Sequence, residues 1–182
     1  MTGPGEDGPR IVVVDDERAN LAALEATLGS QGYRISAYAD PTAAAAAFRA
    51  GDADLLLTDL AMPGLDGLQL MHELTARDPD LATVIMTGEG SITSAVEAMR
   101  EGALDYVLKP LKLSTLLPAI SRALTIRDLR RRNARLEEGL RARTAELERA
   151  LEEADRQAAE RVRAEQALMQ AQKIEAIGRL TG

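Results

Sequence analysis

Cysteine is absent from the 182-residue sequence, and so is tryptophan. Without cysteine the chain can form neither a disulfide nor a thiolate metal site, which fits a reducing compartment. Aromatic residues make up only 2% of the chain, and there is one histidine, His72. No apolar run reaches the length of a membrane span, and residues 1–10 lack the apolar segment of a signal peptide. These absences predict a cytoplasmic protein with no membrane partner.

The excess of acidic residues is confined to the first part of the chain. Residues 1–112 contain 8 Lys or Arg and 18 Asp or Glu, a net charge of -10, whereas residues 113–182 contain 14 and 11, a net charge of +3. All aromatic residues lie in the first part, and the second has no proline after Pro118. The composition therefore changes near Leu113 from that of a globular domain to that of a long helix.

Short apolar segments alternate with helical patterns in the first part. Strands are expected at 10–14, 33–38, 54–59, 83–86 and 105–108, and helices between them at 18–29, 41–50, 66–77 and 91–101. The three consecutive leucines 55–57 are typical of a strand that is buried on both faces between layers of helices. This alternation predicts an α/β fold with a five-stranded, doubly wound parallel sheet.

Acidic residues directly follow two of these strands. Asp59 ends the third strand, before Pro63 and Gly64 turn the chain, and Asp15 and Asp16 follow the first strand. In open parallel sheets, ligands bind at the carboxyl ends of the strands. If the two strands are neighbours, three carboxylates meet there, and such an oxygen-only set suits Mg2+. Capping of the following helix could explain one of these acids but hardly all of them.

The last two strands end in residues that can hold a phosphoryl group. Thr87 supplies a hydroxyl after the fourth-strand core, and Lys109 supplies an ammonium group after the fifth strand. Each alone is more often an ordinary surface residue. Together with the carboxylates they suggest a site in which Asp59 is the nucleophile that forms an acyl phosphate, Mg2+ and Lys109 balance its charge, and Thr87 donates a hydrogen bond.

On these residues, the segment 10–125 resembles a response-regulator receiver domain. The motifs that carry the resemblance are Asp15-Asp16, Asp59, Pro63-Gly64, Asp66-Gly67, Thr87, Tyr106 and Lys109-Pro110. The resemblance implies a flavodoxin-like sheet of strand order 2-1-3-4-5. It also implies that a histidine kinase or another phosphohistidine donor phosphorylates Asp59.

The same resemblance implies roles for single residues. Mg2+ would be held by Asp16, Asp59 and the backbone carbonyl of Ala61, with Asp15 acting mostly through water. Thr87 and Tyr106 would form a switch pair, and the Lys109–Pro110 peptide bond would be cis. Gly88 stands where the family often has a small alanine, and we expect it to loosen that loop without preventing phosphorylation.

The second part is predicted to be one long helix with no stop signal. Its first turns, through Leu124, would pack against the sheet. Beyond them a heptad seam with a stutter after Leu140 is formed by Leu129, Asn133, Leu136, Leu140, Thr144, Leu147, Leu151, Ala154, Ala158, Arg161, Glu165 and Leu168. A single helix cannot bury such a stripe, so we predict a coiled coil over residues 126–169 and a parallel homodimer through residues 126–182. A lone solvated helix remains the alternative.

Nucleic acid is not an expected partner. The run Arg130-Arg131-Arg132 lies among acidic residues, which favours a solvated helix face, and no helix-turn-helix pattern follows residue 113.

Residues 170–182 resemble the start of the dimerisation helix of sensor histidine kinases, just before its phosphoacceptor histidine. The predicted organisation is a disordered tail at 1–9, a receiver domain at 10–125, a signalling coiled coil at 126–169 and this kinase segment at 170–182. We therefore expect a fragment of a hybrid histidine kinase that lacks the phosphoacceptor histidine and the ATP-binding domain. The alternatives are a transcriptional or other output and, less favoured, an aspartate-nucleophile phosphatase, in which a second acid would stand at Ala61.

Overall fold

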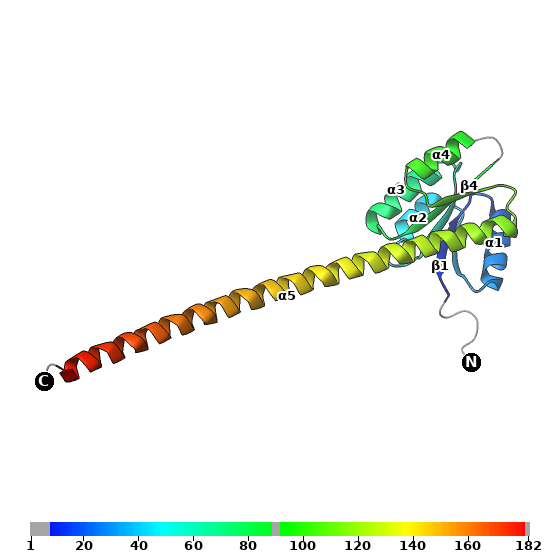
Figure 1. Ribbon diagram of the computed structural model, residues 1–182. Helices are drawn as coiled ribbons and strands as arrows, with labels where there is room; N and C mark the ends of the chain where they lie inside the picture. The colour runs from blue at the N-terminus through cyan, green and yellow to red at the C-terminus, as the bar shows by residue number, and fades with distance from the viewer. Residues whose placement is uncertain (1–7, 89–91, 181–182) are drawn as a thin grey trace. The chain divides into compact units, whose positions relative to one another are not determined.

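The computed structural model describes residues 8–88 and 92–180. Five parallel strands form one sheet in the order β2-β1-β3-β4-β5 (Figure 1). The strands are β1 (Arg10–Val14), β2 (Arg34–Tyr38), β3 (Leu55–Asp59), β4 (Ala82–Thr87) and β5 (Asp105–Leu108). The helices are α1 (Arg18–Ser30), α2 (Pro41–Ala47), α3 (Gly67–Arg77), α4 (Ile92–Arg100) and α5 (Leu113–Leu180). The predicted fold class, strand order and long final helix are confirmed.

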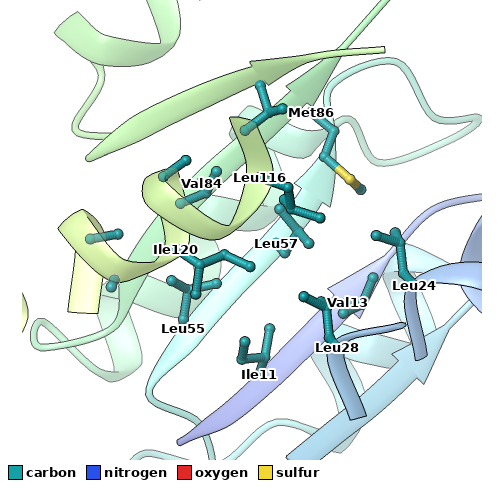
Figure 2. Packing of buried hydrophobic residues seen from close by; sticks show 14 of the residues in the cluster. Ile11, Val13, Leu24, Leu28, Leu55, Leu57, Val84, Met86, Leu116 and Ile120 are labelled. Atoms are coloured by element: carbon teal, nitrogen blue, oxygen red, sulfur yellow. The ribbon is translucent and has the colours of Figure 1, made fainter. Parts of the chain in front are cut away.

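Helices cover both faces of the sheet because the central strands are apolar on both faces. Ile11 and Val13 of β1 pack with α1 and the first turns of α5, whereas Val12 and Val14 pack with α2 and α3. Figure 2 shows the first of these layers, with Leu24 and Leu28 of α1 and Leu116 and Ile120 of α5 pointing onto β1, β3 and β4. All five residues of β3 are buried, so β3 is the centre of the domain.

Most element ends agree with the sequence prediction to within one or two residues. Asp40 caps α2, accepting a hydrogen bond from the Thr42 backbone N–H at 2.9 Å, as expected. The α2 helix ends at Ala47, three residues before the predicted end, because Phe48 turns into extended backbone and is buried in the core. The Lys109–Pro110 bond is cis.

Some predictions fall on residues outside the described ranges. These are most of the predicted disordered tail (residues 1–7), the predicted first residue of the fourth helix (Ser91), and the last two residues of the kinase-like segment (181–182).

The chain divides into two compact units, Met1–Arg132 and Asn133–Gly182, and α5 contributes to both. Within the first unit, the buried Arg127 forms an ion pair with Asp54 at 2.8 Å, and Arg131 forms one with Asp80 at 3.2 Å. The second unit is helical through Leu180. Its side chains from 133 to 175 are exposed except for Ala145, which is half-buried. Across the described residues, no helix combines the length and apolarity needed to cross a membrane.

Candidate phosphoacceptor and metal site

The sheet register brings the three predicted carboxylates together. Strands β1 and β3 are neighbours with Val14 opposite Thr58, so the residues that follow, Asp15 and Asp59, end the two strands side by side. Asp15 is fully buried, Asp59 is 7% exposed, and Asp16 is exposed. One carboxylate oxygen from each lies within 4.8 Å of the others. The convergence predicted from the two strand ends is therefore present in the structure.

Lys109 reaches this cluster from the end of β5. Its Nζ lies 2.7 Å from Asp59 Oδ2 and 2.8 Å from Asp15 Oδ2. Burial by itself lowers the pKa of the Lys109 ammonium, but the hydrogen bonds and negative charges of Asp15 and Asp59 outweigh burial and raise this pKa above its ordinary value. Lys109 therefore stays protonated at neutral pH and joins the two carboxylates.

Asp15 is held by contacts that the sequence did not reveal. Its Oδ1 accepts a hydrogen bond from the Glu17 backbone N–H at 2.9 Å, and the Asn20 amide lies 3.3 and 3.4 Å from its two oxygens. Asn20 was not predicted as a site residue. The only signal for it was an amide in the first turn of the helix that follows the acidic pair, and such a residue is equally common on a solvated face.

The loop after Asp59 is fixed by close backbone approach. A Cβ at Gly67 would lie 2.1 Å from the carbonyl oxygen of Asp59, so only glycine allows the start of α3 to sit against the end of β3. Asp66 and Gln69 form a capping box at this helix start. The intervening loop contains Ala61, which is exposed, and Met62, which is buried. Gly67, which the sequence analysis named only as part of the Asp66-Gly67 motif, is a steric requirement of the site.

The predicted switch residues lie on the neighbouring strands β4 and β5. Thr87 is buried, with its hydroxyl 3.5 Å from the Gly88 carbonyl oxygen, and its own carbonyl accepts a hydrogen bond from the Lys109 backbone N–H at 2.7 Å. Tyr106 pairs with Ile85 and its side chain is 40% exposed. Asp59 and Thr87 thus end the adjacent strands β3 and β4, and Lys109 directly follows β5. Tyr106 lies within β5, three residues before Lys109.

The donor chemistry at this edge fits a hard divalent cation. All candidate ligands are oxygen atoms, and the carboxylates bring three negative charges that one lysine ammonium only partly balances. Asp16 is exposed and makes none of the contacts described for Asp15, so its oxygens face solvent and can accept an ion. His72 lies apart on α3, with its Nε2 3.1 Å from Glu101 Oε2.

Fold and site together define a parallel α/β domain with an acidic, lysine-bridged pocket at the carboxyl edge of its sheet. The family model of the response regulator receiver domain matches residues 11–121. The chain belongs to this family, whose members act in two-component signalling. Receiver domains bind Mg2+ in an acidic pocket, and the Asp15, Asp16 and Asp59 cluster occupies that position here.

The similar proteins match the receiver part of the chain. The C4-dicarboxylate transport transcriptional regulatory protein DctD of Rhizobium meliloti is 37% identical over 115 residues, which are 63% of this chain but only 25% of that regulator. A crystal structure of a response regulator receiver domain protein from Clostridium thermocellum is 31% identical, with a TM-score of 0.63, and covers 66% of this chain and 98% of its own. The structure of NtrX from Brucella abortus in complex with ADP is 34% identical, with a TM-score of 0.67, over 71% of this chain and 30% of NtrX.

Proposed function

We propose that this chain is a phosphorelay receiver that accepts a phosphoryl group on Asp59 from a phosphohistidine donor. The observation that carries the proposal is the nearly buried Asp59 carboxylate held at 2.7 Å by Lys109, with Asp15 and Asp16 within 4.8 Å. An Asp59 oxygen attacks phosphorus and forms a P–O bond. The P–N bond breaks, and its electron pair leaves on the donor imidazole, which takes up a proton.

The residues that would hold Mg2+ are Asp16, Asp59 and the carbonyl of Ala61, with Asp15 acting through water. Bound there, the ion would offset negative charge on the transferred phosphoryl oxygens. Lys109 supplies a second positive charge and is already placed against Asp59. When the phosphoryl group forms, Lys109 can exchange its Asp59 contact for a phosphoryl oxygen while it keeps Asp15.

Thr87 and Tyr106 are the proposed switch pair. The Thr87 hydroxyl makes only a long contact of 3.5 Å to Gly88, so little holds it back from a phosphoryl oxygen on Asp59. Movement of Thr87 would open space beside β5 for the exposed Tyr106 ring to turn inward. This would change the surface formed by β5 and its neighbouring helices.

The output that we propose is a histidine kinase reached through a parallel homodimeric coiled coil. Two features support it: the exposed apolar stripe of the second unit, and the resemblance of residues 170–182 to a kinase dimerisation helix. A transcriptional output is the second candidate, because DctD and other similar proteins are transcriptional regulators. The absence of a nucleic-acid partner accordingly stays a prediction.

Phosphorylation by a small acyl phosphate with Mg2+, read by intact mass, tests the acceptor. We expect one phosphate on the wild type and none on Asp59→Asn. Asp40→Asn is the matched control, because asparagine caps a helix as well as aspartate does and Asp40, which caps α2, is not one of the three clustered carboxylates. Equal uptake by Asp59→Asn and the wild type would refute the assignment, and continued turnover of added phosphoesters would favour a phosphatase instead.

Two assays on the protein expressed at the full length of its gene distinguish the kinase output from the transcriptional output. ATP-dependent phosphorylation on histidine that changes when Asp59 is phosphorylated supports the kinase. Salt-dependent binding to DNA, with no phosphohistidine formed, supports the transcriptional regulator.

A further inference from the structure

Apolar side chains of the second unit recur with a spacing that differs from the heptad predicted from sequence. Between Asn133 and Glu175, eight large hydrophobic side chains are 53% to 72% exposed. Six of them fit one regular spacing along the helix, which we call the frame: Leu136, Leu140, Leu147, Leu151, Val162 and Met169. Leu168 and Ile174 lie one residue outside it. In this unit, no second element is described that could cover the six.

The frame repeats every 11 residues. Leu136 and Leu147 are 11 apart, as are Leu140 and Leu151, and Val162 lies 11 beyond Leu151. Ala158 continues the first series, and Met169 follows it by another 11. The resulting pairs, 136/140, 147/151 and 158/162, each span one turn of helix and recur after three turns.

An 11-residue repeat corresponds to about 3.67 residues per turn, slightly more than the 3.6 of a straight helix. A heptad corresponds to about 3.5 residues per turn and drifts in the opposite sense. The two frames agree through Leu151, and beyond it they share only Ala158. The heptad seam then runs through Arg161, Glu165 and Leu168. The 11-residue seam runs through Val162, Gln166 and Met169 and so replaces Arg161 by an apolar residue.

Each 11-residue repeat has a third position on the same seam, four residues after the second member of the pair, and this position is always polar. It is occupied by Asn133, Thr144, Asp155 and Gln166. Thr144 and Asp155 lie between two apolar pairs, Asn133 lies before the first pair and Gln166 lies after the last. A buried amide or hydroxyl needs a hydrogen-bonding partner, and a parallel copy in register sets Asn133, Thr144 and Gln166 each beside its own equivalent. The same register brings the two Asp155 carboxylates together, which weakens the pair at that position. An antiparallel pair that keeps Leu140 against Leu147 would instead set Asn133 against Ala154.

The features of the stripe point to a second copy of this chain rather than to another protein. The repeat holds over more than three periods, and a partner helix must have the same period to remain in contact over that length. The stripe has no tryptophan, tyrosine or phenylalanine, the residues that anchor most interfaces between different proteins. Basic residues dominate 130–143 and acidic residues 146–155, so like charges flank the seam of a parallel pair. This repulsion is reduced where opposite charges pair within one helix, as Glu137 and Arg141 do at 3.7 Å.

We propose that residues 129–169 pair in parallel and in register with the same residues of a second copy through an 11-residue repeat, which forms a nearly straight, weakly right-handed coil. This inference deepens the homodimer in the proposed function and fixes which side chains meet. Neighbouring residues on a helix point about 100° apart, so Val162 and Arg161 cannot both face the partner. Each pair of adjacent positions therefore distinguishes the two frames.

Because the chain has no cysteine, single substitutions report on this contact without background. We would introduce Val162→Cys and Met169→Cys for the 11-residue frame, Arg161→Cys and Leu168→Cys for the heptad, and Glu160→Cys as an outward-facing control. All five are made in the whole 182-residue chain, oxidised mildly and resolved by non-reducing electrophoresis. A disulfide requires its two Cα atoms to lie within about 7 Å, so only seam positions crosslink quickly.

We expect the variants at 162 and 169 to crosslink at least about fivefold faster than those at 161, 168 and 160, since only seam positions meet the distance requirement. Faster crosslinking at 161 and 168 would overturn the 11-residue frame while leaving a dimer. No crosslinking at any of the five positions would overturn parallel pairing. Phosphate uptake on Asp59, measured in the same samples, shows whether the receiver function holds independently of either result.

Discussion

Leucine has opposite surroundings in the two units of this chain. Leu55, Leu56 and Leu57 of β3 are completely buried, whereas Leu136, Leu140 and Leu147 of the second unit are 62% to 67% exposed. The receiver unit completes its own core on both faces of the sheet, so its fold and its chemistry depend on one chain. The described part of the helical unit is a single helix, and no other element of that unit covers its apolar stripe.

Ion pairs differ between the same two regions. In the receiver, Arg127 and Asp54 are 2.8 Å apart, with side chains 7% and 19% exposed. In the helical unit, Arg141 and Glu137 are 3.7 Å apart and largely in solvent. A buried pair is costly to break because one charge is left without a partner, whereas an exposed pair exchanges its contact for water. The receiver should therefore be sensitive to substitutions that the helical unit tolerates.

The largest difference should appear in phosphoryl acceptance. We expect Asp59→Asn to reduce phosphate uptake at least about 100-fold, since an amide cannot act as the nucleophile. Leu147→Ala, which changes the stripe of the second unit, should leave the rate of uptake within about twofold. Radiolabel or intact-mass time courses measure both, and a loss of uptake in the leucine variant would show that the receiver depends on the stripe.

The second largest difference between the two units should appear when one partner of an ion pair is removed. Asp54→Asn leaves the buried Arg127 guanidinium without its carboxylate, and we expect unfolding free energy to fall by about 3–5 kcal/mol. Glu137→Gln should change stability by less than about 0.5 kcal/mol. All three tyrosines lie in the receiver, so their fluorescence during urea unfolding reports on that unit. Similar losses in the two variants would contradict the distinction drawn between the pairs.

The third largest difference between the two units should appear when a leucine is replaced by alanine. Leu56→Ala removes a fully buried side chain and should cost about 3 kcal/mol of receiver stability. Leu140→Ala should leave the tyrosine-detected transition in place and lower the concentration-dependent helicity measured by circular dichroism. If Leu140→Ala shifted the tyrosine transition as much as Leu56→Ala does, the two units would not be energetically separate.

Replacement of glycine by alanine should change stability least, with opposite signs in the two units. Gly67→Ala places a Cβ 2.1 Å from the Asp59 carbonyl and should destabilise the receiver by about 2 kcal/mol. A Cβ at Gly139 meets no atom within 4 Å, so Gly139→Ala should stabilise the helix by about 1 kcal/mol. Thermal unfolding followed by circular dichroism and by tyrosine fluorescence measures both. Stabilisation by Gly67→Ala would show that the start of α3 can move away from Asp59.

Local patterns in the sequence were sufficient for the strands and for the acidic cluster. The run 55–57 is apolar because β3 is covered on both faces, and Asp15 and Asp59 follow their strands because the chain turns at the sheet edge. The capping of α2 by Asp40 is likewise a contact between near neighbours in sequence. The end of α2 was missed because Phe48 leaves the helix to reach a core formed by distant segments.

The part of the site that sequence reasoning missed depends on long-range contacts. Asn20 was not expected to hold Asp15, and Gly67 was named as part of a family motif without its close approach to the end of β3 being expected. Arg127 was assigned to the predicted coiled coil from residue 126 onward, yet it is buried against Asp54, 73 positions earlier in the chain. No periodicity around residue 127 distinguishes this arginine from the exposed ones that follow it.

By itself, the sequence determined the alternation of strands and helices, the carboxylates at two strand ends and the repeating apolar positions of the long helix. These features follow from side-chain periodicity and from turn residues, which act over a few positions. Only the tertiary structure decided that Lys109 joins Asp15 to Asp59, that Asn20 and Gly67 shape the site, and that Arg127 belongs to the receiver. The physical reason is that these contacts form where separate strands and helices meet, and their strength depends on burial that only the assembled domain provides.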